Sequence, residues 1–71
     1  MARIPSRAQL THDMALKLRE AKAAYDPSGL VTWAVIARQA DITTEQLHRV
    51  LAGLAMTPEV EEKLEQWLLH A

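Results

Sequence analysis

The chain has 71 residues, no cysteine and a formal net charge of −1. This length suffices for one domain, and without cysteine there can be no disulfide and no thiolate metal site. No apolar run approaches the roughly 18 residues of a membrane span, and the N-terminus lacks the apolar stretch of a signal peptide. We therefore expect a single cytoplasmic domain.

The composition favours helices over strands. There are only 2 glycines and 3 prolines, and the dominant residue types lose little side-chain freedom in a helix. No stretch shows the β-branched alternation of a strand. The charges are uneven, with a basic segment over residues 1–24 and an acidic one over residues 55–71. Two interpretations fit this asymmetry: one side faces phosphate, or both are ordinary solvated helix faces.

A short arm over residues 1–5 precedes a first helix, predicted from about residue 7 to residue 24. Ser6 and Gln9 have the spacing of a capping box, in which each side chain bonds the other residue's backbone amide. Thr11 is a competing start for the helix. The apolar side chains on one helical face are expected to be buried: Leu10, Met14, Leu18, Ala21 and Tyr25.

The strongest helix-breaking segment is residues 26–29. Pro27 disfavours helical backbone at Asp26, and Gly29 permits a positive φ. Thr32 is then placed to cap a second helix that ends at Gln39 or Ala40.

A tight turn at Asp41 and Ile42 separates the second helix from a third. Thr43 and Gln46 have the spacing of a second capping box, so the third helix starts there and ends within residues 51–53.

The last helix starts at Thr57 and Pro58, because proline after a threonine cap is favoured at the first helical position. It extends to about His70. Its predicted apolar stripe consists of Val60, Leu64, Trp67, Leu68 and Ala71. With no internal repeat or linker, the chain is predicted to form one domain with its closing helix over residues 57–70.

Residues 32–53 fit a helix-turn-helix, which needs two helices that cross steeply at a turn of three to four residues. Ala37 lies where the two backbones must approach, and only a small side chain allows that. Asp41 opens the turn, where a left-handed backbone costs aspartate little. Five apolar side chains are predicted to fill the wedge between the helices: Ile36, Ala40, Ile42, Leu47 and Val50.

The segment VTWAVIARQADIT (residues 31–43) resembles the start of the DNA-reading unit of lambda-repressor-like and lac-repressor-like domains. LHRVLAG (residues 47–53) is similar to its third helix, and residues 57–68 resemble the helix that closes the core. The helix before the motif favours the lambda-repressor-like arrangement. Asp41 departs from the pattern, since both families usually have glycine there.

This resemblance implies an all-α fold of four helices, or five, with the helix-turn-helix at the second and third. It also implies sequence-specific binding of double-stranded DNA by a small transcriptional regulator or repressor that acts as a homodimer. The second helix of such a motif enters the major groove. The contacting positions of the family fall on Thr43, Thr44, Glu45, His48 and Arg49.

Most of these positions have competing interpretations. Arg49 is the strongest candidate base reader, because a guanidinium pairs bidentately with guanine; a phosphate contact or a free surface position is the alternative. Gln46 can read adenine, but its capping role is favoured. Glu45 can accept from cytosine N4, but it more often complements the helix dipole. Thr44 suits a thymine methyl group or a phosphate.

Other residues are candidates for the DNA backbone. Amides near Thr32 and Trp33 can hold a phosphate, although both tryptophans, Trp33 and Trp67, are better interpreted as packing residues than as stacking platforms. The further phosphate or minor-groove candidates are Arg38, Arg3 and Arg7.

No metal or cofactor is expected, since the histidines lie on separate predicted helices. His48 is therefore interpreted as a groove-facing polar residue. No catalytic set or phosphate-cradling glycine loop indicates an enzyme or a small-molecule substrate.

The sequence also leaves unpaired apolar residues. Leu16 and Ala23 fall off the core stripe of the first helix, and Leu69 falls off that of the last. Leu69 beside Ala71 is the favoured dimer contact. The rival function is a protein-interaction module, such as an inhibitor, an antitoxin-like partner or a targeting domain, on the same scaffold.

Overall fold

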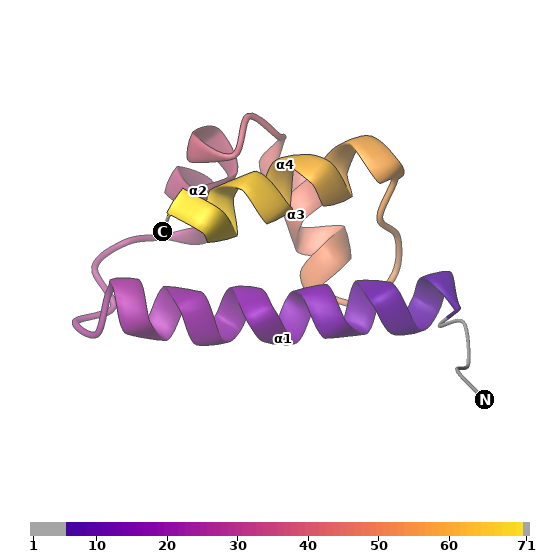
Figure 1. Cartoon of the computed structure of the whole chain (residues 1–71). Helices are drawn as coiled ribbons and strands as arrows, with labels where there is room; N and C mark the ends of the chain where they lie inside the picture. Colours follow the sequence, from indigo (N-terminus) through magenta and orange to yellow (C-terminus); the bar gives the residue numbers. More distant parts are fainter. Residues whose placement is uncertain (1–5, 71) are drawn as a thin grey trace.

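The computed structural model describes residues 6–70, which form four helices and no strand. They are α1 (Arg7–Tyr25), α2 (Trp33–Gln39), α3 (Thr44–Leu51) and α4 (Pro58–His70). Figure 1 shows α1 as a long base, with the three shorter helices packed on one side of it. The all-helical prediction is confirmed. Within the described range no helix is long and apolar enough to cross a membrane.

The predicted caps decide where α1 and α4 begin. The Ser6 hydroxyl accepts from the Gln9 amide at 3.2 Å, which is one half of the predicted capping box, so α1 starts at Arg7. The alternative start at Thr11 is wrong, because Thr11 is buried inside the helix and its hydroxyl donates to the Arg7 carbonyl. At α4 the Thr57 hydroxyl accepts from the Val60 amide at 3.2 Å.

A left-handed residue follows each of the two short helices. Asp41 has φ 62° after α2, and Gly53 has φ 75° after α3. At the first site the amide of Ile42 reaches back to the Ala37 carbonyl at 2.9 Å. This pattern satisfies carbonyls that the helix end would otherwise leave unpaired. The expectation that Asp41 takes the left-handed conformation is confirmed.

One hydrophobic core draws on all four helices. Its fully buried large side chains come from α1, α2, α3 and α4 in turn: Leu18, Ile36, Leu47, Val50 and Leu64. Ala37 and Ala40 are buried where α2 meets this cluster, and Ile42 packs against it from the turn. The predicted wedge between α2 and α3 is therefore present.

The predicted stripe of α1 needs correction. Tyr25 is 47% exposed, because it is the last residue of the helix; its ring makes an edge-on contact with Trp67. Leu10 and Ala21 are only partly buried, whereas Thr11 and Ala15 are buried. The buried face is thus rotated toward small residues, which let the other helices approach α1 closely.

The stripe of α4 matches the prediction for Val60, Leu64 and Trp67, with Leu68 partly buried. Ala71 lies outside the described residues. Met56, assigned only to a connecting segment, is buried and belongs to the core.

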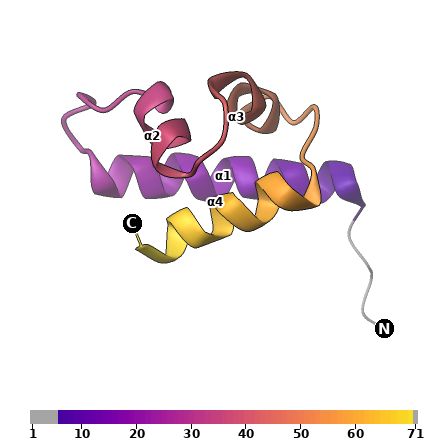
Figure 2. The ribbon, with the colours of Figure 1, turned by 90° about the horizontal axis from the view of Figure 1, so that it is seen from above.

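Figure 2 shows that α1 and α4 run in the same general direction. At their starting ends, the Arg7 guanidinium donates to the Met56 carbonyl at 2.9 Å and lies 3.7 Å from the Glu61 carboxylate. At their far ends, the rings of Tyr25 and Trp67 meet with centroids 6.2 Å apart. Figure 2 also shows α2 and α3 next to each other, and α3 packs against α1.

Candidate nucleic-acid interface

One side of α3 is exposed along its whole length. Leu47 and Val50 are fully buried, and they orient the helix so that its other side faces solvent. The exposed residues are those that the sequence predicted to point outward: Thr44, Glu45, Gln46, His48, Arg49 and Ala52. We call this surface the α3 face.

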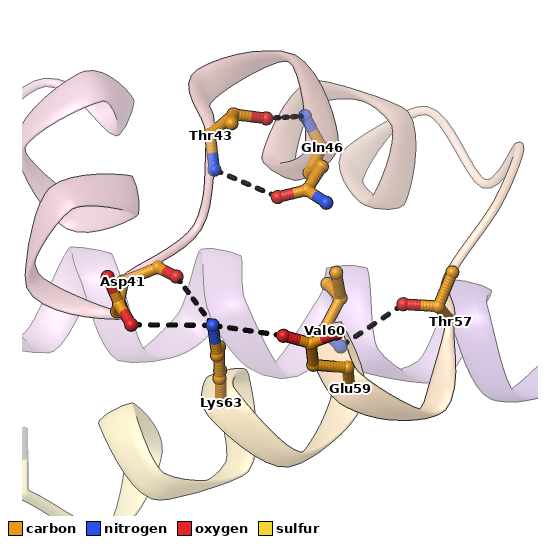
Figure 3. A network of polar contacts seen from close by, with 7 residues as sticks. All are labelled: Asp41, Thr43, Gln46, Thr57, Glu59, Val60 and Lys63. Atoms are coloured by element: carbon orange, nitrogen blue, oxygen red, sulfur yellow. Dashed lines mark hydrogen bonds and ion pairs between the residues drawn. The ribbon is translucent and has the colours of Figure 1, made fainter.

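Thr43 and Gln46 form a reciprocal capping box at the start of the α3 face. The Thr43 hydroxyl accepts from the Gln46 amide, and the Gln46 side-chain carbonyl accepts from the Thr43 amide, both at 3.0 Å (Figure 3). The capping interpretation of Gln46 is confirmed. Because its carbonyl oxygen is engaged, a bidentate pairing of Gln46 with adenine would compete with the start of its own helix.

The two charged side chains of the α3 face are paired with each other. An Arg49 guanidinium nitrogen lies 2.6 Å from a Glu45 carboxylate oxygen. The residues are four apart on the helix, a spacing at which opposite charges attract. The two residues were interpreted one at a time from the sequence. Their spacing of four residues is the sequence signal that indicates the pair.

A lysine from α4 holds the turn between α2 and α3. The Lys63 ammonium lies 3.1 Å from the Asp41 carbonyl oxygen, 3.3 Å from the Asp41 carboxylate and 3.3 Å from the Glu59 carboxylate. Figure 3 shows it between the two acids. These bonds, to Glu59 first and to Asp41 second, raise the pKa of Lys63. Local sequence patterns did not predict this contact, which joins residues 22 positions apart.

Two of the site residues predicted at α2 make contacts that stabilise the fold, and the third is on the surface. The Thr32 hydroxyl accepts from the Val35 amide at 3.4 Å as the cap. Trp33 is partly buried against the core, with the Lys22 ammonium 5.5 Å from its ring centroid. Arg38 is exposed.

Trp67 is 8% exposed, and its indole N–H donates to the Gln39 side-chain oxygen at 2.9 Å. With Trp33 also packed against the core, the packing interpretation of both tryptophans is confirmed.

The basic residues of α1 lie mainly in contacts within the protein. Arg7 bonds the segment before α4, and the Arg19 guanidinium donates to the Leu51 carbonyl at 2.7 Å, at the end of α3. Lys22 lies over Trp33. Arg3 and the arm over residues 1–5 fall outside the described residues. Three cations of α1 therefore make contacts with other segments: Arg7 with the segment before α4 and with Glu61, Arg19 with the end of α3, and Lys22 with α2.

The histidines are on three different helices, α1 for His12, α3 for His48 and α4 for His70. Within residues 6–70 no three side chains of histidine, aspartate or glutamate are grouped so that they could hold a metal ion.

An open groove of about 620 Å³ lies where the end of α1, the end of α2 and one side of α4 meet. Tyr25, Gln39 and Trp67 line it, together with the carboxylates of Glu59 and Glu62. It is separate from the α3 face and was not anticipated from the sequence.

Comparison with known proteins found no matching family model, no similar curated protein and no similar solved structure.

Proposed function

We propose that the chain is a lambda-repressor-like helix-turn-helix domain that binds double-stranded DNA, with α3 as its recognition helix. The observation that carries the proposal is the α3 face: a short, capped helix that buries Leu47 and Val50 completely and leaves its polar side entirely exposed. A major groove about 12 Å wide admits such a helix, and its first residues then reach the base edges.

The surrounding contacts support the same function. A recognition helix must be held rigidly, because a small displacement breaks hydrogen bonds to base edges. The capping box fixes the start of α3, Arg19 bonds its last turn, and Lys63 holds the turn before it. Arg38 is exposed on α2 as a candidate phosphate contact.

The proposal includes a two-fold dimer, since one recognition helix contacts only a few base pairs. Leu69 is 75% exposed near the end of α4 and is the proposed contact. Leu30 and Leu54, both in connecting segments, are as exposed and are the alternative surfaces. Sedimentation of Leu69→Lys, Leu30→Lys and Leu54→Lys beside the unchanged protein identifies which leucine the dimer needs.

A salt titration with a random-sequence duplex pool tests DNA binding. Neutralising phosphates releases counterions, so log K should fall with log salt by about 0.9 per contact, and about six contacts in a dimer would give a slope near −5. Arg49→Ala should cost about 1–3 kcal/mol at one preferred base pair and leave the fold intact. Absence of binding at low salt contradicts the proposal.

The groove beside Trp67 favours a second candidate function, a protein-interaction module. Its aromatic lining and the carboxylate of Glu62 suit a basic peptide segment, while the Glu59 carboxylate is paired with Lys63, which also lines the groove. In that case the protein binds no duplex pool, and Tyr25→Ala abolishes partner binding while Arg49→Ala leaves it unchanged.

A further inference from the structure

We propose that Glu45 and Arg49 act as one unit that recognises a guanine and a neighbouring cytosine in the major groove. This inference rests on the proposed function and adds the class of DNA sequence that the α3 face selects. The observation behind it is the 2.6 Å contact between the two side chains, which leaves most of their hydrogen-bonding groups free.

Glu45 lies in the first turn of α3, and Arg49 follows one turn later. The side chains are 74% and 57% exposed, so the pair stands on the surface. The contact joins one guanidinium nitrogen to one carboxylate oxygen. Both groups are therefore accessible to a molecule that binds the α3 face.

The remaining hydrogen-bonding groups suit a G·C pair. A guanidinium has five N–H donors, so one bond to Glu45 leaves enough to pair bidentately with guanine O6 and N7. The second carboxylate oxygen of Glu45 is free to accept from the amino group of cytosine N4. Adenine needs one donor and one acceptor and would have to divide its two bonds between Arg49 and Glu45, whereas guanine takes both of its bonds from Arg49 and leaves Glu45 for cytosine.

Pairing also solves an electrostatic problem on this face. A lone carboxylate at the front of a recognition helix would be repelled by the phosphates. Joined to Arg49, the Glu45 carboxylate belongs to a pair of zero net charge. The contact also restricts the long arginine side chain before binding, so less conformational entropy is lost when it meets a base.

The adjacent polar residue does not provide an alternative. Gln46 could otherwise read adenine, but its side-chain carbonyl bonds the Thr43 amide. Thr44 and His48 are exposed on the same face, and the preference for guanine and cytosine is assigned to Glu45 and Arg49.

Selection from a random duplex library tests the inference, using the unchanged protein, Glu45→Gln, Arg49→Lys and the control Glu65→Gln. Glu65 is an exposed residue of α4, so its variant removes the same charge away from α3. The unchanged protein should enrich guanine at one position and cytosine beside it, each about 5- to 150-fold over other bases. Arg49→Lys should weaken the guanine preference, because an ammonium still donates to guanine but lacks the planar pair of donors of a guanidinium.

Glu45→Gln should lose both preferences and yet bind unselected DNA more tightly, because a negative charge is gone. Glu65→Gln should keep both preferences. Circular dichroism and melting of each variant establish that it is folded. If folded Glu45→Gln keeps the guanine preference, or if the unchanged protein prefers A·T pairs here, the paired-recognition inference is overturned. If the unchanged protein binds no duplex at low salt, the proposed function itself fails.

Discussion

The ammonium group of Lys63 bonds both the carbonyl oxygen and the carboxylate of Asp41, at 3.1 and 3.3 Å. Asp41 is the residue whose φ of 62° turns the chain from α2 into α3. A side chain of α4 thus holds the residue that sets the direction of α3. The turn before the α3 face is thus contacted from α4 at the protein surface.

Replacing Asp41 separates the backbone requirement from the ion pair. Asp41→Gly removes both the carboxylate and the β-carbon and accepts the positive φ freely, whereas Asp41→Ala removes the carboxylate but keeps a β-carbon in the left-handed region. We expect Asp41→Ala to be less stable than Asp41→Gly by about 1 kcal/mol. Urea unfolding of the two variants measures the difference. Equal stability would mean that the backbone relaxes from the left-handed conformation.

Asp26 should contribute stability that disappears in acid. Its carboxylate accepts from the Val31 amide at 2.6 Å and the Ser28 hydroxyl at 2.8 Å, and the bond from Val31 is the main reason that its pKa is lowered. The folded pKa lies below the ordinary value of 3.8. The contribution is therefore present above that pH and is lost as the pH falls through the folded value.

The matched variant is Asp26→Asn, which keeps an acceptor and removes the charge. It should be less stable than the unchanged protein at neutral pH, and the gap should close as the pH is lowered below 3.8. Chemical unfolding over a pH series checks this. A gap that persists in acid would show that the substitution disturbs packing or geometry instead of removing a charge-dependent bond.

Ala37 should not tolerate a larger side chain. It is almost fully buried in the core cluster where α2 approaches α3, and added methylene groups would force the helices apart. We expect Ala37→Leu to cost roughly 1–3 kcal/mol. Ala34→Leu is the control, since Ala34 is exposed on the same helix. Comparable losses in thermal unfolding at both positions would argue against close packing at Ala37.

Arg19 should stabilise the protein through α3 without touching its exposed face. Its guanidinium donates to the Leu51 carbonyl, in the last turn of α3, where a positive charge also complements the helix dipole. Arg19→Ala should cost about 0.5–1.5 kcal/mol, as for a typical net hydrogen bond. Lys17→Ala, exposed on the same helix, should cost less in the same denaturant titration. A larger loss of stability for Lys17→Ala than for Arg19→Ala would mean that the hydrogen bond from Arg19 to Leu51 does not stabilise the protein.

The local signals in the sequence predicted the helices well. Ser6, Thr32, Thr43 and Thr57 have the spacing of caps, and each hydroxyl accepts from the amide three residues on. These signals are reliable because the donor and the acceptor lie within one turn of chain. The turn at Asp41 was predictable for the same reason.

Burial on α1 was harder to predict. Tyr25 is apolar enough to be placed in the core, but the helix extends past most of its partners at that end. Ala15 and Thr11 carry no strong apolar signal, and both are buried. Which face of a long helix is covered depends on the positions of the other helices. The spacing of the apolar residues in the helix indicates that face only approximately.

In the candidate site, too, the local features were predictable from the sequence and the long-range contacts were not. The exposed positions of α3 followed from its apolar spacing, and the capping role of Gln46 followed from the four residues that begin the helix. The pairing of Arg7, Arg19 and Lys63 with distant carbonyls did not, because the partner of a long cationic side chain depends on which helix end lies within its reach.

By itself, the sequence determined the helices, their caps and the left-handed turn, since each depends on side chains within about one helical turn of the backbone groups they satisfy. Only the tertiary structure decided which face of α1 is covered, which cations of the basic segment are used inside the protein, and how α4 holds Asp41. These three features arise from contacts between residues far apart in the chain, and the local pattern of residue types does not predict such contacts.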